Sequence, residues 1–147
     1  MIDQNPTFEI VHTCPDWYDG PREGIADYQG QPHLFVSDYG DFSGRKNLYS
    51  LSPINEETFL LAKEDWAIWL RWNVAFHKGQ VAQDTHPALP DERDRHEELK
   101  RLLEDRLVLD PAHTFRRDAE FRNRQDASWS GLGFSPLEVC WRELDTI

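Results

Sequence analysis

The sequence predicts an α+β domain in which a mostly antiparallel sheet packs against two helices. Short runs of alternating apolar and polar residues fill the first third of the chain, helical patterns fill the middle, and alternation returns near the end. A chain of 147 residues is long enough for one cooperative core and too short for two comfortable domains. We therefore expect a single domain over residues 1–147, with no internal repeat.

The first third is expected to form strands separated by tight turns. Asp-Gly-Pro within Asp16–Pro21 favours a turn, because glycine permits positive φ and proline fixes the next φ. The segment Gln29–Pro32 is expected to join two strands as an antiparallel hairpin. The predicted strands are Thr7–Thr13, Gly24–Tyr28, His33–Tyr39 and Leu48–Ile54.

The strongest local pattern predicts a helix over about Glu56–Lys78. Asn55 is a suitable N-cap because its side chain accepts hydrogen bonds from the first turn, and Gly79 is a suitable C-terminal stop. We expect Trp72 at the margin of the buried face. That face is predicted to carry Phe59, Ala62, Trp66, Trp69, Leu70, Asn73, Phe76 and His77.

A second helix is predicted over about Asp91–Val108, with Asp91 as its cap. Its charged residues recur at intervals of four, which is typical of a solvated face. Its apolar side is expected to carry His96, Leu99, Leu102, Leu103 and Leu107.

The last third gives weaker patterns. Thr114–Arg124 suits either a strand with Phe115 and Phe121 inward or a helical turn, whereas Asp126–Pro136 is rich in glycine and serine and predicts a loop. Alternation over Leu137–Leu144 predicts a closing strand.

Two cysteines, Cys14 and Cys140, lie near opposite ends of the chain. One pair is far short of a disulfide framework, and no C-x-x-C motif is present. A bridge between them stays open if the two terminal strands pair. The expected compartment is a reducing cytoplasm.

The charge balance narrows the class of partner. The chain carries 16 Lys and Arg against 27 Asp and Glu, a net charge of −11, and the excess is largest over residues 1–60. Nucleic acids and anionic membranes need clustered basic residues, so we expect neither as a partner. A basic or neutral protein partner fits better, as does a cationic ligand, although an acidic surface also serves solubility alone.

Nothing in the sequence predicts a route into or across a membrane. The N-terminus lacks a basic segment followed by an apolar one, so no targeting segment is expected. The longest apolar stretch, Trp66–Phe76, is interrupted by Arg71 and Asn73 and is too short to span a bilayer.

No catalytic motif of high specificity is present, and we expect no cofactor. The weak metal-ligand candidates are Asp84, His86 and His96, which a helix hairpin could bring together with His77. Their spacing matches no known ligand pattern. The alternative is that Asp84 and His86 hold a proline-rich turn by hydrogen bonds.

Aromatic residues interleaved with carboxylates give a second set of candidates, because such groups bind cations or form interaction hot spots. Tryptophans at helical spacing are usually core, which is our expectation for Trp66 and Trp69. Asn73 and His77 on an apolar face need partners, either in the sheet or around a small pocket. The predicted binding residues are Trp17, Tyr18, Asp19, Trp72, Asn73 and His77.

One basic cluster stands out in this acidic chain: Arg116, Arg117, Arg122 and Arg124. It could hold a phosphate or a carboxylate. Acidic residues interleave with it, so we expect internal ion pairs instead.

Four segments together carry a resemblance to a known group of proteins. They are Asp16–Pro21 (DWYDGP), Gly24–Phe35 (GIADYQGQPHLF), Glu64–Trp72 (EDWAIWLRW) and Thr85–Pro90 (THPALP). In this order they resemble a family of small bacterial proteins that has no established activity. The resemblance covers roughly residues 10–110 and implies a bacterial origin and one domain, but no chemistry.

These observations predict a non-catalytic acidic binding or regulatory protein, of an immunity or inhibitor type, that engages a protein partner. The alternative is a small enzyme or ligand-binding protein with a polar pocket. In one form of this hypothesis, the pocket holds a divalent metal. The residues predicted to line that pocket are Asp19, His33, Asn73, His77 and His86.

Overall fold

A computed structural model describes residues 7–17, 20–38, 47–124 and 136–144 of the chain. Over these ranges it contains six strands and two α-helices, which confirms the α+β class. Two short 3₁₀ turns, Gln83–Thr85 and Pro90–Glu92, lie between the helices. The elements are β1 (Glu9–Trp17), β2 (Pro21–Tyr28), β3 (Gln31–Ser37), β4 (Leu48–Pro53), α1 (Glu56–His77), α2 (Arg93–Leu103), β5 (Phe115–Asn123) and β6 (Leu137–Arg142).

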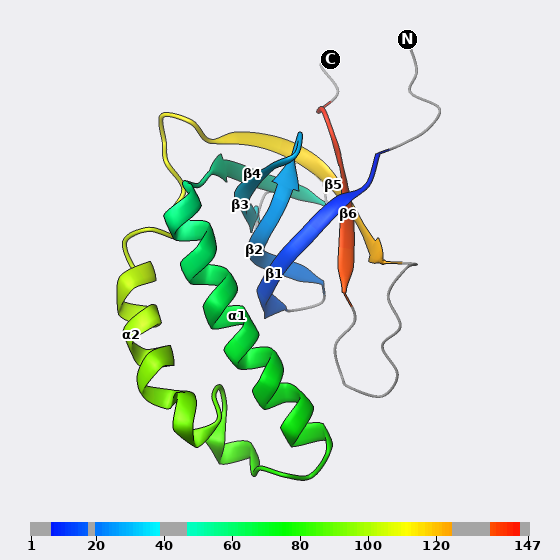
Figure 1. The fold of residues 1–147 in the computed structure, drawn as a ribbon. Coiled ribbons are helices and arrows are strands. Elements are labelled where there is room, and N and C mark those ends of the chain that lie inside the picture. The colour runs from blue at the N-terminus through cyan, green and yellow to red at the C-terminus, as the bar shows by residue number, and fades with distance from the viewer. Residues whose placement is uncertain (1–6, 18–19, 39–46, 125–135, 145–147) are drawn as a thin grey trace.

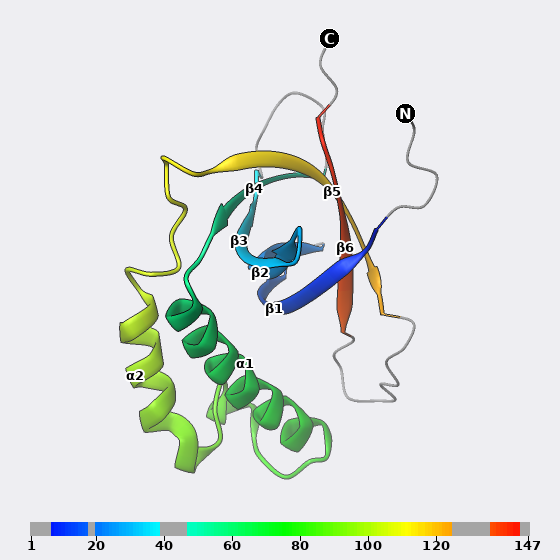
Figure 2. The same cartoon turned by 45° about the horizontal axis from the view of Figure 1, so that its top comes forward.

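The strands form a closed antiparallel barrel in the order of the sequence (Figure 1). Closure comes from β1 and β6, where Glu9 lies opposite Val139 and Ile10 lies opposite Glu138. Both views show α1 and α2 together on one side of the barrel (Figures 1 and 2). The prediction of an antiparallel sheet packed against two helices is therefore right only in part. The sheet curls around its own core, and the helices pack on its outer side.

The predicted hairpin is confirmed, but its turn consists of Gln29 and Gly30 alone, because Gln31 and Pro32 already pair in β3. Gln29 and Gly30 have φ of 54° and 79°, and Tyr28 pairs with Gln31 across the turn. Positive φ at both central residues gives a turn whose twist matches the flanking strands. The Glu9 carboxylate accepts hydrogen bonds from the backbone N–H groups of Gln29 and Gly30 at 3.1 and 2.8 Å, which ties the start of β1 to this turn.

The interior of the barrel is filled by aromatic and aliphatic side chains. The Phe35 ring lies 5.5–6.1 Å from the rings of Tyr49, Phe121 and Trp141, measured between centroids. The Tyr49 hydroxyl donates to the Pro21 carbonyl oxygen at 2.6 Å, so this buried polar group is satisfied. Buried residues of this core are Cys14, Ala26, Phe35, Tyr49, Leu51, Ala119 and Val139.

The first helix begins as the sequence predicts. Asn55 accepts a hydrogen bond from the backbone N–H of Thr58 at 2.8 Å, and the helix ends at His77, before Gly79 with φ of 73°. The predicted buried face is only partly right, because α1 contacts the barrel on one side and α2 on another. The buried side chains are Thr58, Ala62, Ile68, Trp72, Asn73 and Ala75, while the predicted His77 is exposed.

The second helix is shorter than predicted. It spans Arg93–Leu103, and the 3₁₀ turn Pro90–Glu92 occupies the place of its expected first turn. Asp91 is therefore not the cap of α2, whose N-cap residue Glu92 makes no capping hydrogen bond through its side chain.

The C-terminal third resolves as two strands. The alternatives left open for Thr114–Arg124 are settled in favour of a strand, and Phe115 and Phe121 pack against the barrel core. Of the predicted loop Asp126–Pro136, only Pro136 lies among the described residues. The terminal strands do pair, yet Cys14 and Cys140 are both free thiols and both buried.

The predicted internal ion pairs of the arginine cluster are confirmed for two of its members. Arg116 lies 3.1 Å from Asp38, and Arg122 pairs with Glu138 across β5 and β6, so the acidic partners come from outside β5. Arg117 instead donates to the Tyr28 hydroxyl at 3.0 Å. Within the described residues, neither helix has the length and apolar character that a membrane span requires.

Gly24 on β2 generates a test of the barrel packing. A Cβ atom at this position would lie 2.1 Å from the Thr13 carbonyl oxygen and 2.8 Å from Phe35 Cζ. We expect Gly24→Ala to lower the free energy of unfolding by about 2–4 kcal/mol, because the backbone of β1 must move. Urea denaturation measures this loss.

The matched control is Gly79→Ala. Its φ is 73° and no atom lies within 4 Å of the added Cβ, so only backbone strain of about 1 kcal/mol is expected. Equal losses in the two variants would show that the close approach of β1 and β2 at Gly24 does not limit stability.

Candidate functional site

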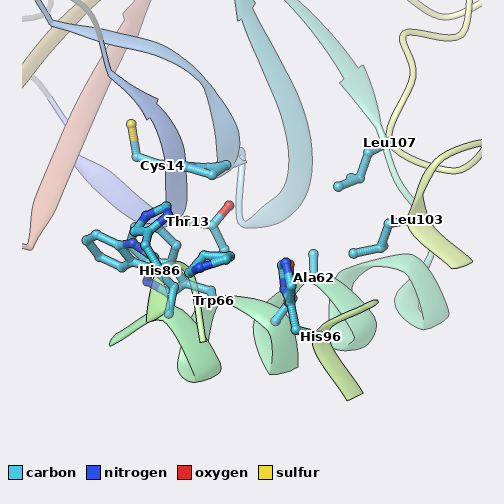
Figure 3. Close-up of a pocket in the computed structure, with 12 residues that line it drawn as sticks. Thr13, Cys14, Ala62, Trp66, His86, His96, Leu103 and Leu107 are labelled. Carbon is cyan, nitrogen blue, oxygen red and sulfur yellow. The ribbon is translucent and has the colours of Figure 1, made fainter. Parts of the chain in front are cut away.

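A pocket of about 320 Å³ lies outside the barrel, where β1, α1, α2 and the turn before α2 meet (Figure 3). Thr13 and Cys14 on β1 lie on one side of it, and Trp66, Ala62 and His96 lie on the opposite side. The pocket is lined by Thr13, Cys14, Pro15, Ala62, Asp65, Trp66, Trp69, His86, Pro87, His96, Leu103 and Leu107.

His96 and Asp65 form the polar centre of this pocket. His96 Nδ1 lies 2.6 Å from Asp65 Oδ1, and the two side chains are 15% and 26% exposed. An ionised carboxylate only accepts hydrogen bonds, so the neutral imidazole carries its proton on Nδ1. Nε2 then presents a lone pair, and no residue in the described part of the chain bonds to it.

His86 is a second imidazole on the pocket wall. Its ring packs edge-on against Trp72 with centroids 4.6 Å apart. Trp72 Nε1 donates to Thr85 Oγ1 at 2.7 Å, and Thr85 Oγ1 donates in turn to the Ala82 carbonyl oxygen at 2.6 Å. These bonds fasten the turn to α1 and hold His86 at the rim of the pocket.

Trp66 and Trp69 give the pocket an aromatic wall. Their rings stack with centroids 4.8 Å apart and an interplanar angle of 20°, one helical turn apart on α1. The face of such a pair is a large apolar surface with a negative quadrupole, which suits the faces or edges of other rings. Both side chains are only partly buried.

Cys14 also lines the pocket but is not a reactive thiol. Burial raises the pKa of Cys14 to about 12, and the hydrogen bond from the Arg22 backbone offsets this only in part. The thiolate is the nucleophilic form, so a protonated thiol offers no nucleophile at neutral pH. The site therefore contains an oriented imidazole without an activated cysteine beside it.

The predicted binding residues that the structure describes differ in exposure. Trp17 is 59% exposed at the end of β1, whereas Trp72 is 5% exposed, deep in the contact between α1 and the turn. The expectation of Trp72 at the margin of the buried face is wrong, because the bond to Thr85 draws the indole inward. Tyr18 and Asp19 lie outside the described residues.

Asn73 and His77 interact with each other at the end of α1. Asn73 is buried, and His77 Nδ1 lies 2.9 Å from the Asn73 carbonyl oxygen. This pair does not line the pocket.

The structure does not bring together all the described residues of the alternative pocket that was predicted from the sequence. His33 stands at one end of the barrel interior, with its ring against those of Tyr28 and Phe115. It therefore lies apart from Asn73 and His77 on α1. Of the members of that set that the structure describes, only His86 lines the observed pocket.

The weak metal candidates separate in the same way. His86 and His96 do line one pocket, as a helix hairpin predicts, but Asp84 and His77 are not among its lining residues. Within the described ranges, no group of three or more His, Cys, Asp and Glu side chains is arranged to hold a metal ion.

Sequence reasoning missed Asp65, Trp66 and Trp69 as site residues. The spacing of the two tryptophans was visible, but it is equally typical of a buried helix face. The contact of Asp65 with His96 joins residues 31 positions apart on two helices, so only the packing of those helices reveals it.

Comparisons with known proteins add no family or relative. No protein-family model matches the chain, and no curated protein and no solved structure matches it either. The site must therefore be interpreted from its own geometry.

The state of Cys14 generates a testable prediction. A rise in thiol pKa from 9.0 to about 12 lowers the thiolate fraction at neutral pH about a thousandfold. In a Cys140→Ser variant, which isolates Cys14, we expect iodoacetamide to react slowly in buffer and rapidly after unfolding in urea. Mass spectrometry over time measures both rates. Alkylation in buffer at the rate of the unfolded chain would contradict the burial of this thiol.

Proposed function

We propose that the chain is a small-molecule-binding protein whose site is the pocket around His96, Asp65, Trp66 and Trp69. The observation that carries this proposal is a formed cavity of about 320 Å³ with an imidazole on its wall, that of His96, which Asp65 holds through Nδ1. Ligand sites have volumes of about 300–1,000 Å³, mostly apolar walls and a few convergent polar groups. This pocket has all three properties.

The barrel interior is not an alternative site in the part of the chain that is described. Small barrels hold a ligand only when their inward-facing side chains leave space. Here Phe35 is fully buried and contacts Tyr49, Phe121 and Trp141 across the interior. The space for a ligand lies outside the barrel, under α1.

The walls indicate a compact apolar ligand with a polar group. Leu103, Leu107 and Pro87 contribute aliphatic surface, and Trp66 contributes an aromatic ring. Apolar contact drives the binding of such a ligand, and the polar group fixes its orientation.

Toluene is a probe for the apolar part of this site. We expect toluene to shift the indole N–H resonances of Trp66 and Trp69 saturably in nitrogen-15 NMR spectra, while that of Trp17 stays in place. A Trp66→Leu variant keeps the wall apolar but loses the ring face. It should bind toluene roughly three- to tenfold more weakly, the range expected for one aromatic contact.

Trp17→Leu is the matched control, since Trp17 is an exposed tryptophan outside the pocket. Its affinity for toluene should equal that of the wild type. Shifts that do not saturate, or that depend on Trp17 rather than Trp66, would overturn the proposed site.

A protein partner is the second candidate function, and Trp17 is the observation that favours it. An indole that is 59% exposed at a strand end is a typical hot-spot residue, and a net charge of −11 favours a basic protein. This role is compatible with the bacterial, cytoplasmic setting expected from the sequence.

Affinity capture tests this second candidate. We expect the wild-type chain to retain one basic protein, and salt to weaken that binding. Trp17→Ala should lose it. Leu60→Ala, which removes a similarly exposed apolar residue from α1, should keep it. Equal capture by both variants would exclude Trp17 as the contact.

A further inference from the structure

We propose that the ligand of this pocket is a neutral hydroxyaromatic compound, a phenol, whose hydroxyl donates a hydrogen bond to His96 Nε2. This inference rests on the proposed function and names the chemical class that the same site selects. Three features of the pocket carry it: the tautomer of His96, the isolation of Nε2, and the charge and shape of the walls.

The tautomer is set by Asp65. With Nδ1 at 2.6 Å from Asp65 Oδ1, the neutral imidazole donates from Nδ1, and in that form Nε2 is left as an acceptor. A second nitrogen oriented in this way behaves as a fixed lone pair rather than as a rotating polar group. The site therefore offers an acceptor to its ligand and selects a donor.

Because Nε2 has no hydrogen-bond partner among the described residues, the site discriminates against ligands that lack a donor. The His96 side chain is 15% exposed and lines the pocket. A ligand that fills the pocket excludes water from it. If it brings no donor, Nε2 is left unpaired, and that penalty is larger than the gain from an ordinary hydrogen bond.

The described charges around the pocket disfavour ionic ligands. Among the described residues that line it, Asp65 is the one carboxylate, there is no lysine or arginine, and Asp65 is already engaged by His96. An ammonium group would find no free carboxylate, and a carboxylate ligand would face Asp65 at close range. A neutral hydroxyl is the donor that remains.

The walls favour an aromatic ring over an aliphatic alcohol. The rings of Trp66, Trp69 and Pro87 line the cavity, and the two indoles are stacked on one another. A planar ring packs against such surfaces with little loss of conformational entropy. Ring and hydroxyl together define a phenol.

Two probes of nearly equal shape test the inference: p-cresol and p-xylene, which differ by a hydroxyl in place of a methyl group. Transfer from water alone favours p-xylene, because the hydroxyl of p-cresol must be desolvated. We expect the wild type to bind p-cresol roughly three- to tenfold more tightly, as one net hydrogen bond provides. Titration calorimetry or the indole N–H resonances measure both dissociation constants.

Variants at His96 identify the acceptor. His96→Leu should bind p-xylene at least as tightly as the wild type does and should lose the preference for p-cresol. His96→Gln keeps an acceptor oxygen on the side chain and should restore part of that preference.

The outcomes separate this inference from the proposed function. Binding of neither probe would overturn the proposed function itself. Binding of both, with p-xylene equal or tighter in the wild type, would overturn the phenol inference and leave a ligand pocket. A p-cresol preference that persists in His96→Leu would show that another group, such as His86, is the acceptor, and would overturn the assignment to His96.

Discussion

The outer side of the molecule depends on one packing contact, in which Ala62 of α1 meets Ile25 of β2 and Leu103 of α2. All three side chains are buried and form one apolar cluster. Alanine at the point of contact lets the helix backbone approach the barrel closely. The next turn carries Trp66 and Trp69, which line the pocket. The pocket lies in this region, with Ala62 and Leu103 among its own walls.

The two helices are held together by apolar packing, and their ion pairs help to fix how one helix lies against the other. Ile68, Ala88 and Leu99 form a buried cluster between them. Exposed ion pairs contribute little to stability, although hydrogen bonds from Arg95 and Arg71 lower the pKa values of Glu64 and Glu92. These pairs instead fix the position of α2 and the preceding turn relative to α1. Each links a residue of α1 to one of α2 or the turn before it, and the more buried pair of Asp65 and His96 lies in the same interface.

Local features of the fold could be predicted from the sequence because local residues determine them. Asn55 caps α1 through its own side chain, and Gln29 and Gly30 provide the positive φ that the hairpin requires. Barrel closure could not be predicted, since it depends on Glu9 and Ile10 meeting a strand more than a hundred residues away. Nothing in an alternating pattern distinguishes the edge of an open sheet from the seam of a barrel.

The site was harder to predict than the fold for a related reason. Trp72 was expected at the margin of a buried face, but a threonine thirteen positions away accepts its indole N–H and buries it. His86 and His96 were recognised as polar residues that needed an explanation. Their partners, Trp72 and Asp65, belong to α1, so their roles emerge only when the turn and α2 fold back on that helix.

The connection between β4 and β5 shows how the chain divides its tasks. These strands pair directly, with Leu51 opposite Phe115, so the barrel is complete without the segment of residues 54–114 that joins them. That segment supplies nine of the twelve residues around the pocket, while the barrel supplies only Thr13, Cys14 and Pro15. Stability resides mainly in the packed interior of the barrel, where a change of one atom is costly. The proposed ligand pocket is built mainly by the segment that connects the two strands, and binding sites on other scaffolds are commonly built on such connections.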